Sequence, residues 1–298
     1  MELAPISLFV YNRLWHTQQT IEALKKNYLA SESELIIFSD GPKSEADREN
    51  VLMVRNYAKT ISGFKNVTII ERELNFGLAQ SIIKGVTEVV GKYGRIIVLE
   101  DDMVTSTFFL KFMNESLEFY RDKEKVISIH GYIYPVKIEL PETFFLRGAD
   151  CWGWATWKRG WDLFEADGRK LLDEIKRSGL QKKFDIKGAY PYSEMLKDQI
   201  NGKNDSWAIR WYASAFVKDR LTLYPGRSLI RNIGTDGSGT HCGMIGVYDT
   251  YVSVSSVRTG NIRIEENCHA LREVEKYFKS IGPDIMGRLK GILVKVFK

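Results

Sequence analysis

The sequence predicts an α/β fold with a mixed, mostly parallel central sheet, helices on both faces and an elaborated C-terminal half. In the first half of the chain, short apolar runs alternate with segments of helical spacing, which is typical of strands joined by helical crossovers. The second half is less regular and carries a tryptophan-rich and a glycine-rich segment. No internal repeat or low-complexity linker divides the 298 residues, so we expect one elaborated domain.

Five strands are predicted by short apolar runs with polar residues on either side. The first run is PISLFVY, and the second ends at a turn signal, Asp40-Gly41-Pro42. A helix followed by a further strand is expected within residues 203–226. The five runs are residues 5–11, 34–40, 66–73, 95–102 and 125–132.

The predicted helices lie between these runs and show apolar residues at helical spacing. In residues 17–27, Ile21 and Leu24 share one side of the helix, and Thr17 suits the N-cap position. The other predicted helical segments are residues 43–61, 75–90, 105–122 and 167–184.

Composition and charge exclude several classes of function. Hydrophobic residues make up 44% and charged residues 27%, as in ordinary soluble proteins. The net charge of +5 is too small for a duplex-DNA binder, so no nucleic-acid partner is expected, and it fits an anionic substrate or an acidic membrane. The three cysteines are far apart, which indicates neither a zinc cluster nor a disulfide framework. Because no apolar run is long enough to span a membrane and no signal peptide precedes the first strand, we expect a cytoplasmic protein.

Residues 285–298 form a basic amphipathic segment at the end of the chain. Apolar residues such as Ile285, Leu289 and Phe297 share one helical face, and the basic residues lie on the other. Such a helix can lie in the interface of an anionic membrane, at the inner face of the plasma membrane for a cytoplasmic protein. The alternative is an ordinary surface helix that packs on the domain.

Polar residues follow four of the predicted strands. The clusters are Asn12-Arg13, Ser39-Asp40, Asn75-Phe76-Gly77 and Glu100-Asp101-Asp102. In open parallel sheets, ligands bind outside the carboxyl ends of the strands. We therefore expect the four clusters to meet at one edge of the sheet and to form the functional site.

The triplet Glu100-Asp101-Asp102 follows the apolar run RIIVL. Three adjacent carboxylates at the end of a buried strand repel one another and lose solvation, unless something neutralises them. Mg²⁺ or Mn²⁺ prefers carboxylate oxygens and typically takes one or two of them together with substrate phosphates. The triplet therefore predicts a metal held between the protein and a diphosphate, and the alternative is a solvated acidic turn.

Four motifs in order resemble glycosyltransferases of the GT-A fold. They are VYNR, FSDGP, NFGLAQS and VLEDDMVTSTFFLKF, within residues 4–115. Among these enzymes the chain is similar to family 2 and to N-acetylglucosaminyltransferase I, whose DxD-type motif is also written Glu-Asp-Asp. The resemblance is weaker from GWATW and NDSWAIRW to GSGTHC, in the second half of the chain.

The resemblance implies a role for each carboxylate of the triplet. Asp102 would ligate a Mn²⁺ or Mg²⁺ ion that bridges the two phosphates of a UDP-sugar. Asp101 would face the ribose or the waters of the metal. Glu100 would face the donor sugar or the nucleotide.

The resemblance also assigns residues after the first three strands to the nucleotide. Asp40 would accept the N3–H of uracil, and Asn12 and Arg13 would lie along the nucleotide or its phosphates. Asn75 and Gly77 would let the backbone approach the nucleotide closely. The alternatives are a turn at Asp40, a surface charge at Arg13 and a simple helix entry at Asn75.

Inverting transfer needs a base that takes the proton of the acceptor hydroxyl. The resemblance places this base at Asp205, at the start of a helix in NDSWAIRW. Asp205 also suits a helix N-cap, and Asp198 is the nearest rival carboxylate.

Two further candidates lie in the second half. The resemblance makes His241, in the glycine-rich segment, a second metal ligand, and a phosphate or loop contact is the alternative. Trp152 and Gly153 are expected to line the sugar pocket. Trp157 and Trp161 belong to a set at helical spacing and are expected in the core.

Together these expectations describe a metal-dependent glycosyltransferase that uses a UDP-sugar and a glycan or lipid-linked glycan acceptor, in bacterial surface or exported glycan synthesis. We expect residues 1–115 to bind the nucleotide-sugar, residues 116–265 to complete the same domain with the acceptor and the base, and residues 266–298 to form a helical tail. Two alternatives are a sugar-phosphate nucleotidyltransferase and a non-catalytic nucleotide-sugar binder. A nucleotidyltransferase would carry a glycine-rich signature after the first strand, and this chain lacks it. A non-catalytic binder could dispense with the metal ligand and the base, and this chain has both Asp102 and Asp205.

Overall fold

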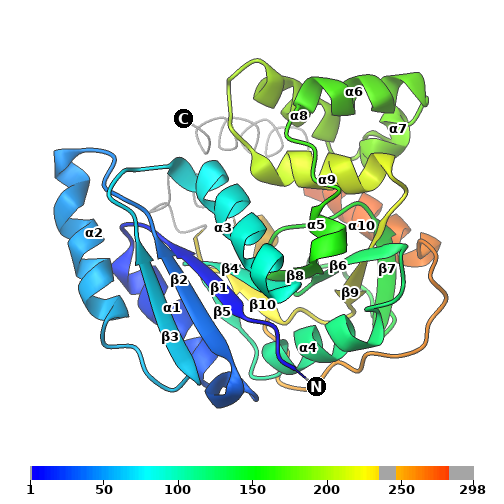
Figure 1. Ribbon diagram of the computed structural model, residues 1–298. Coiled ribbons are helices and arrows are strands. Elements are labelled where there is room, and N and C mark those ends of the chain that lie inside the picture. Colours follow the sequence, from blue (N-terminus) through cyan, green and yellow to red (C-terminus); the bar gives the residue numbers. More distant parts are fainter. Residues whose placement is uncertain (1, 235–245, 282–298) are drawn as a thin grey trace.

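The computed structural model describes residues 2–234 and 246–281, and within these ranges an eight-stranded sheet forms the centre of the molecule (Figure 1). The strand order is β3-β2-β1-β4-β8-β6-β9-β7. A second, two-stranded sheet pairs β10 with β5. The strands are β1 (Ile6–Val10), β2 (Glu34–Ser39), β3 (Asn66–Glu71), β4 (Arg95–Glu100), β5 (Met103–Thr105), β6 (Val126–His130), β7 (Thr143–Arg147), β8 (Trp154–Trp157), β9 (Leu221–Pro225) and β10 (Ile230–Asn232).

The predicted mixed, mostly parallel sheet is confirmed. Strands β3, β2, β1 and β4 are all parallel, and β6 is parallel to β9. The antiparallel strand β8 lies between β4 and β6, and the antiparallel strand β7 lies at the edge beside β9. One sheet therefore runs through both halves of the chain.

The helices lie on both faces of the sheet, as predicted, because alternate strand residues point to opposite sides. Ile6, Leu8 and Val10 pack with α1 and α4, whereas Phe9 packs with α3 and α9 on the other face. The α-helices are α1 (Leu14–Lys25), α2 (Glu45–Ala58), α3 (Gly77–Tyr93), α4 (Phe109–Phe119), α5 (Lys158–Trp161), α6 (Gly168–Arg177), α7 (Gln181–Phe184), α8 (Tyr192–Ile200), α9 (Trp207–Val217) and α10 (Cys268–Ile281). Short 3₁₀ turns are η1 (Ala30–Glu32), η2 (Ile186–Gly188) and η3 (Gly246–Tyr248).

Three local predictions were wrong. Helix α1 begins at Leu14, so Thr17 is not its N-cap; its hydroxyl instead donates to the carbonyl of Arg13 at 2.9 Å. The segment predicted as a helix over residues 105–122 first completes β5 and enters α4 only at Phe109. The segment 167–184 splits into α6 and α7 at Gly179, whose φ of +64° ends the first helix.

The tryptophan-rich segment is a strand followed by one short helix, although its spacing suggested one continuous helical face. Trp154 and Trp157 stand at the two ends of β8 and enter the cores on opposite faces of the sheet. Trp154 packs with Trp161, Trp207 and Trp211 at ring distances of 5.6–5.8 Å. Burial of Trp157 and Trp161 in the core agrees with the expectation for both residues.

The first part of the predicted tail packs on the domain. In α10, Ala270, Val274 and Phe278 are buried against the side chains of Phe144 and Leu146 on β7. The basic segment 285–298 lies outside the part of the chain that the structure describes. No helix of the described part is both long enough and apolar enough to cross a membrane.

Candidate active site

The expected residues that follow β1, β2 and β4 lie at the carboxyl edge of these parallel strands. In the sheet Phe9 of β1 is in register with Phe38 of β2 and with Glu100 of β4, so these three strands end side by side. The short antiparallel strand β10 pairs with β5, which begins directly after the carboxylate triplet. This pairing brings the backbone of Gly234 against Asp102.

Arg13 lies against two carboxylates of the triplet. Its Nη2 bonds Oδ1 of Asp101 and Oδ2 of Asp102, the latter at 2.7 Å, and its Nε donates to Oδ2 of Asp101 at 3.2 Å. The side chains of Asp101 and Asp102 are only 7% and 12% exposed in these pairs. The sequence predicts that a metal neutralises the triplet. In this structure Arg13 supplies the neutralising positive charge.

Burial and mutual repulsion shape the ionisation of the triplet. Burial, followed by the charges of Asp102 and Asp101, raises the pKa of Glu100 to about 8. Burial also raises the pKa of Asp101, and Arg13 opposes that rise. For Arg13, burial lowers the pKa, but the two aspartates outweigh burial and raise it above its ordinary value. Near neutral pH the cation-free site therefore holds an arginine cation and a largely protonated Glu100.

Asp102 offers one oxygen to a cation. Its Oδ1 is buried and has no hydrogen-bond partner in the described part of the chain, while its Oδ2 accepts a hydrogen bond from Nη2 of Arg13. Residues 2–234 and 246–281 contain no group of three or more His, Cys, Asp or Glu side chains arranged to hold a metal. The donor set nonetheless suits Mn²⁺ or Mg²⁺, because these ions accept one or two protein carboxylates and complete their shell with phosphate and water. The proposed second ligand, His241, lies outside the described residues.

Gly234 leaves room for this arrangement. A Cβ atom built on Gly234 would overlap Oδ2 of Asp102 and approach Nη1 of Arg13 to 3.1 Å. The amide of Gly234 donates to Oδ1 of Asn232 at 2.8 Å, which fixes the backbone beside the carboxylate. The sequence analysis missed this residue, because only the pairing of β10 with β5 brings it to the triplet.

Asp40 anchors the beginning of α3. Its carboxylate accepts the backbone N–H groups of Phe76 and Gly77, both at 2.9 Å, and that of Gly41 at 3.1 Å. Asn75 supports the same junction by donating from its side chain to the carbonyl of Gly41 at 2.7 Å. Gly77 has a φ of +73°, and a Cβ atom there would meet no other atom within 4 Å. The three expected nucleotide-binding residues therefore form one structural unit that joins β2 to α3.

Asn12 lies on the α2 side of this edge. Its side-chain amide donates to Oδ1 of Asp47 at 3.0 Å. The phenol of neighbouring Tyr11 accepts the backbone N–H of Lys43 at 2.9 Å. The turn after β1 is thus tied to the start of α2, with Asn12 and Arg13 directed to different acidic partners.

The segment before β8 lies beside the triplet, because β8 runs antiparallel to β4. Trp152 donates its backbone N–H to Nε2 of His130 at 3.1 Å, and its ring packs edge-on against Tyr132 at 4.8 Å. Gly153 has a φ of +61°, and its carbonyl accepts the N–H of Gly131 at 2.7 Å. The pKa of the neighbouring Cys151 thiol is raised by burial, then by Asp150 and Glu100, which places this segment close to the triplet.

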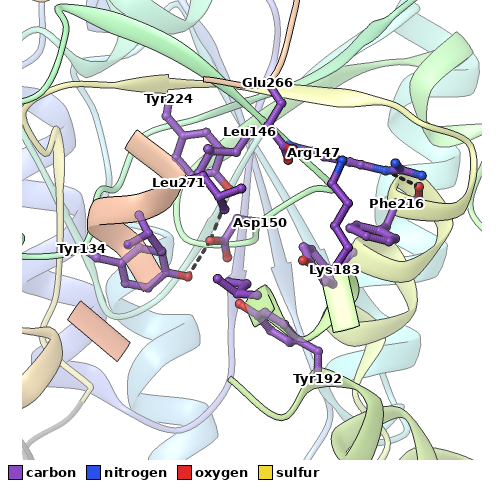
Figure 2. Close-up of a pocket in the computed structure, with 13 residues that line it drawn as sticks. Tyr134, Leu146, Arg147, Asp150, Lys183, Tyr192, Phe216, Tyr224, Glu266 and Leu271 are labelled. Carbon is purple, nitrogen blue, oxygen red and sulfur yellow. Dashed lines mark hydrogen bonds and ion pairs between the residues drawn. The ribbon is translucent and has the colours of Figure 1, made fainter. Parts of the chain in front are cut away.

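Asp150 is a site-proximal carboxylate that the sequence analysis did not single out. It lines a small cavity together with tyrosine, charged and aliphatic side chains, and it lies near Tyr134 and Tyr224 (Figure 2). Its Oδ2 accepts the hydroxyls of Tyr134 at 2.9 Å and Tyr224 at 3.5 Å, and its Oδ1 accepts the N–H of Cys151 at 2.9 Å. Because these donors satisfy the carboxylate, Asp150 holds the segment that leads to Trp152. Its place two residues before Trp152 is the one sequence signal that could have drawn attention to it.

Asp205 stands before α9 but does not cap it. The N-cap is Ser206, whose hydroxyl accepts the N–H of Ile209 at 3.1 Å, so the N-cap alternative for Asp205 is wrong. Asp205 is 53% exposed in its ion pair with the buried Arg210, at 2.9 Å. The rival Asp198 pairs with Lys203 at 3.0 Å.

Residues 6–127 match the family model described as Glycosyl transferase family 2. This part of the chain, which is less than half of it, is thus similar to family 2 glycosyltransferases, and it contains the β1, β2, β3 and β4 ends described above. No curated protein matches the chain.

Solved structures give weak likenesses. A mannosyltransferase from Pyrobaculum calidifontis, in complex with GDP-Man and Mn²⁺, is 13% identical with a TM-score of 0.33, over 45% of this chain and 39% of that one. The S. aureus protein TarS is 13% identical with a TM-score of 0.38, over 76% of this chain and 36% of that one. A UDP-glucose pyrophosphorylase complexed with UDP-glucose is 10% identical with a TM-score of 0.36, over 75% of this chain and 90% of that one. The chain thus spans well under half the length of the first two proteins.

Proposed function

We propose that the protein transfers a sugar from a UDP-sugar to an acceptor hydroxyl with inversion, assisted by a divalent cation. The observation that carries this proposal is the buried carboxylate of Asp102, whose Oδ1 has no hydrogen-bond partner among the described residues and which lies in the segment that matches the family 2 glycosyltransferase model. A buried carboxylate oxygen without a partner is costly in a protein interior, so Oδ1 of Asp102 is a favourable position for a cation to bind.

The cation would be held by Asp102, with His241 as a second ligand, and when bound it would neutralise the diphosphate of the donor. Asp101 would bind the ribose, and Glu100 the donor sugar. The carboxyl of Glu100 can accept a hydrogen bond from a sugar hydroxyl when it is ionised, and it can also donate one when it is protonated.

The nucleotide would lie along the ends of β1, β2 and β3. Asp40 would accept the N3–H of uracil through the lone pairs that its backbone donors leave free, and Asn75 and Gly77 would shape the surface under the base. Asn12 would contact the nucleotide from the α2 side, and Arg13 would contact the phosphates.

Trp152 and Gly153 would line the sugar pocket. They belong to the segment that Asp150 and His130 fix beside the triplet. A flat aromatic face beside a glycine suits a sugar ring, because the ring can stack on the indole and approach the backbone closely.

Asp205 would act as the base. It would take the proton of the acceptor hydroxyl while that oxygen attacks the anomeric carbon, and UDP would leave from the opposite side of the ring. The guanidinium of Arg210, 2.9 Å from Asp205, holds that carboxylate in position before α9. Because Asp205 is half exposed, an acceptor can reach it. The resemblance to N-acetylglucosaminyltransferase I in the surrounding NDSWAIRW motif supports the same assignment.

A cytoplasmic enzyme that uses a cytosolic donor suits bacterial surface or exported glycan synthesis. A lipid-linked acceptor would explain the basic segment 285–298 as a contact with the anionic inner face of the plasma membrane. Deletion of that segment should then release the protein from anionic liposomes, and an intact chain that does not bind them would refute the membrane role.

A donor screen tests the activity. The full chain is incubated with Mn²⁺, each UDP-sugar and a mixture of acceptors, and release of UDP is measured. We expect one UDP-sugar to give UDP, and Asp205→Asn to bind UDP normally but to lose about 10²-fold or more in transfer. Absence of UDP release with every donor would contradict transferase activity. Formation of pyrophosphate from UTP and a sugar 1-phosphate would indicate a nucleotidyltransferase instead.

A further inference from the structure

Arg13 is positioned to act as a replaceable cation inside the carboxylate triplet. We propose that Arg13 couples cation binding to diphosphate binding: it neutralises Asp101 and Asp102 while the site is empty, and it moves to the diphosphate when a divalent cation takes Asp102. This inference rests on the proposed function, and it adds that the cation and the nucleotide bind cooperatively.

The backbone around Arg13 is fixed, so that its side chain moves from a stable base. The carbonyl of Arg13 accepts the N–H and the hydroxyl of Thr17, at 3.0 and 2.9 Å. One turn further along α1, the hydroxyl of Thr20 donates to the carbonyl of Asp101 at 2.7 Å. Helix α1 therefore holds the backbone of Arg13 and the backbone of the triplet in one rigid unit. The contacts of the Arg13 side chain are the part that can change.

The contacts of Arg13 compete with a metal for the same carboxylates. Its guanidinium binds both oxygens of Asp101 and the Oδ2 of Asp102, whereas Oδ1 of Asp102 has no hydrogen-bond partner within residues 2–234 and 246–281. A divalent cation on Asp102 would stand beside the guanidinium in a poorly solvated site, where like charges repel strongly. Free Mn²⁺ should therefore bind the empty site weakly.

A diphosphate removes this conflict. It brings negative charge that balances the cation, and its oxygens match the fork of donors on a guanidinium as well as a carboxylate does. With Arg13 on the phosphates, both oxygens of Asp102 are open to the cation. Because linkage is reciprocal, UDP should raise the affinity for Mn²⁺ by the same factor as Mn²⁺ raises the affinity for UDP.

The test compares Mn²⁺ binding to the full chain and its Arg13→Gln variant, without and with UDP, by titration with detection of free Mn²⁺ by electron paramagnetic resonance. Arg48→Gln is the matched control, because Arg48 is exposed on α2 and pairs only locally with Glu45. For the wild type and the control, we expect weak binding of free Mn²⁺ and an increase of about tenfold or more with UDP. For Arg13→Gln, we expect about tenfold tighter binding of free Mn²⁺ and an effect of UDP below about threefold.

Arg13→Gln that binds free Mn²⁺ no more tightly than the wild type would overturn the inference, since a purely structural arginine would weaken the site when removed. If Arg13→Gln does not fold, Arg13→Lys replaces it. Lysine keeps the positive charge but lacks the paired N–H donors of a guanidinium. Binding of free Mn²⁺ should therefore stay weak, while the increase in Mn²⁺ affinity caused by UDP should fall severalfold. An effect of UDP equal to that in the wild type would then reject the role of Arg13. One outcome separates the two proposals: UDP does not change the Mn²⁺ affinity of the wild type, while Arg13→Gln binds free Mn²⁺ more tightly than the wild type. That result would refute the proposed function but would still support competition between Arg13 and Mn²⁺ for the carboxylates.

Discussion

Replacing Asp40 by alanine should destabilise the fold, because this carboxylate holds the junction between β2 and α3. It is 6% exposed and accepts the backbone N–H groups of Gly41, Phe76 and Gly77. Two of these groups belong to the first turn of α3, where backbone N–H groups lack partners within the helix. The negative charge also lies at the positive end of the helix dipole.

The magnitude follows from these three bonds. Hydrogen bonds to a charged group contribute about 1.5–3 kcal/mol each. The loss is smaller than three times that value, because Gly77 is only partly buried and water can reach its N–H in the variant. We therefore expect Asp40→Ala to lower the free energy of unfolding by about 2–4 kcal/mol, which corresponds to a fall in Tm of about 3–6 °C for a chain of 298 residues.

Thermal unfolding followed by circular dichroism measures this loss. The control is Asp167→Ala, because Asp167 caps the exposed start of α6 through a single bond to the N–H of Arg169, at 2.9 Å. The control should cost about 1 kcal/mol. If Asp40→Ala costs no more than Asp167→Ala, the carboxylate does not anchor α3 and the reasoning fails.

Two further predictions concern the triplet and its neighbouring segment. Gly234→Ala should lower the affinity for UDP in the presence of Mn²⁺ by about tenfold, because the added Cβ displaces the carboxylate of Asp102. Titration calorimetry measures this affinity. An unchanged affinity would mean that the backbone at Gly234 shifts to accommodate the Cβ without disturbing Asp102. Burial lowers the pKa of His130 in the folded protein, so as the pH falls His130 is protonated in the unfolded chain before it is protonated in the folded one. The free energy of unfolding should therefore decrease as the pH drops below about 6.5, by at most about 1.4 kcal/mol per pH unit. His130→Gln, which keeps an acceptor for the N–H of Trp152, should remove that part of the pH dependence in urea titrations, and an unaltered profile would exclude His130 as its source.

The parallel part of the fold could be predicted from sequence because its signals are local. The runs that became β1, β2, β3, β4 and β6 are short and rich in apolar residues, and polar or turn residues follow them, so each strand can be recognised from a few neighbouring residues. The common carboxyl edge then follows from the parallel arrangement. The strand β8 could not be predicted in this way, because Trp154 and Trp157 have a spacing that suits a helix, and only pairing with β4 and β6 extends this segment.

The candidate site shows the same division. The ends of β1, β2 and β4 indicated where Arg13, Asp40 and the triplet meet, yet the sequence did not reveal which partners they choose. Arg13 binds carboxylates across 88 residues of sequence, and Gly234 reaches Asp102 through the pairing of β10 with β5. Such contacts depend on long-range pairing, which leaves no periodic signal in the chain.

The central claim is that the triplet forms a cation-dependent site for UDP, and the shift in Tm caused by nucleotides tests it most directly. UDP with Mn²⁺, at about one hundred times the dissociation constant, should stabilise the full chain by about 2.7 kcal/mol, whereas CDP, GDP or UDP without the cation should do much less. Asp102→Ala should abolish this stabilisation, and alanine at Glu100 or Asp101 should only weaken it. No Mn²⁺-dependent stabilisation by UDP, or an equal loss in all three variants, would contradict the account.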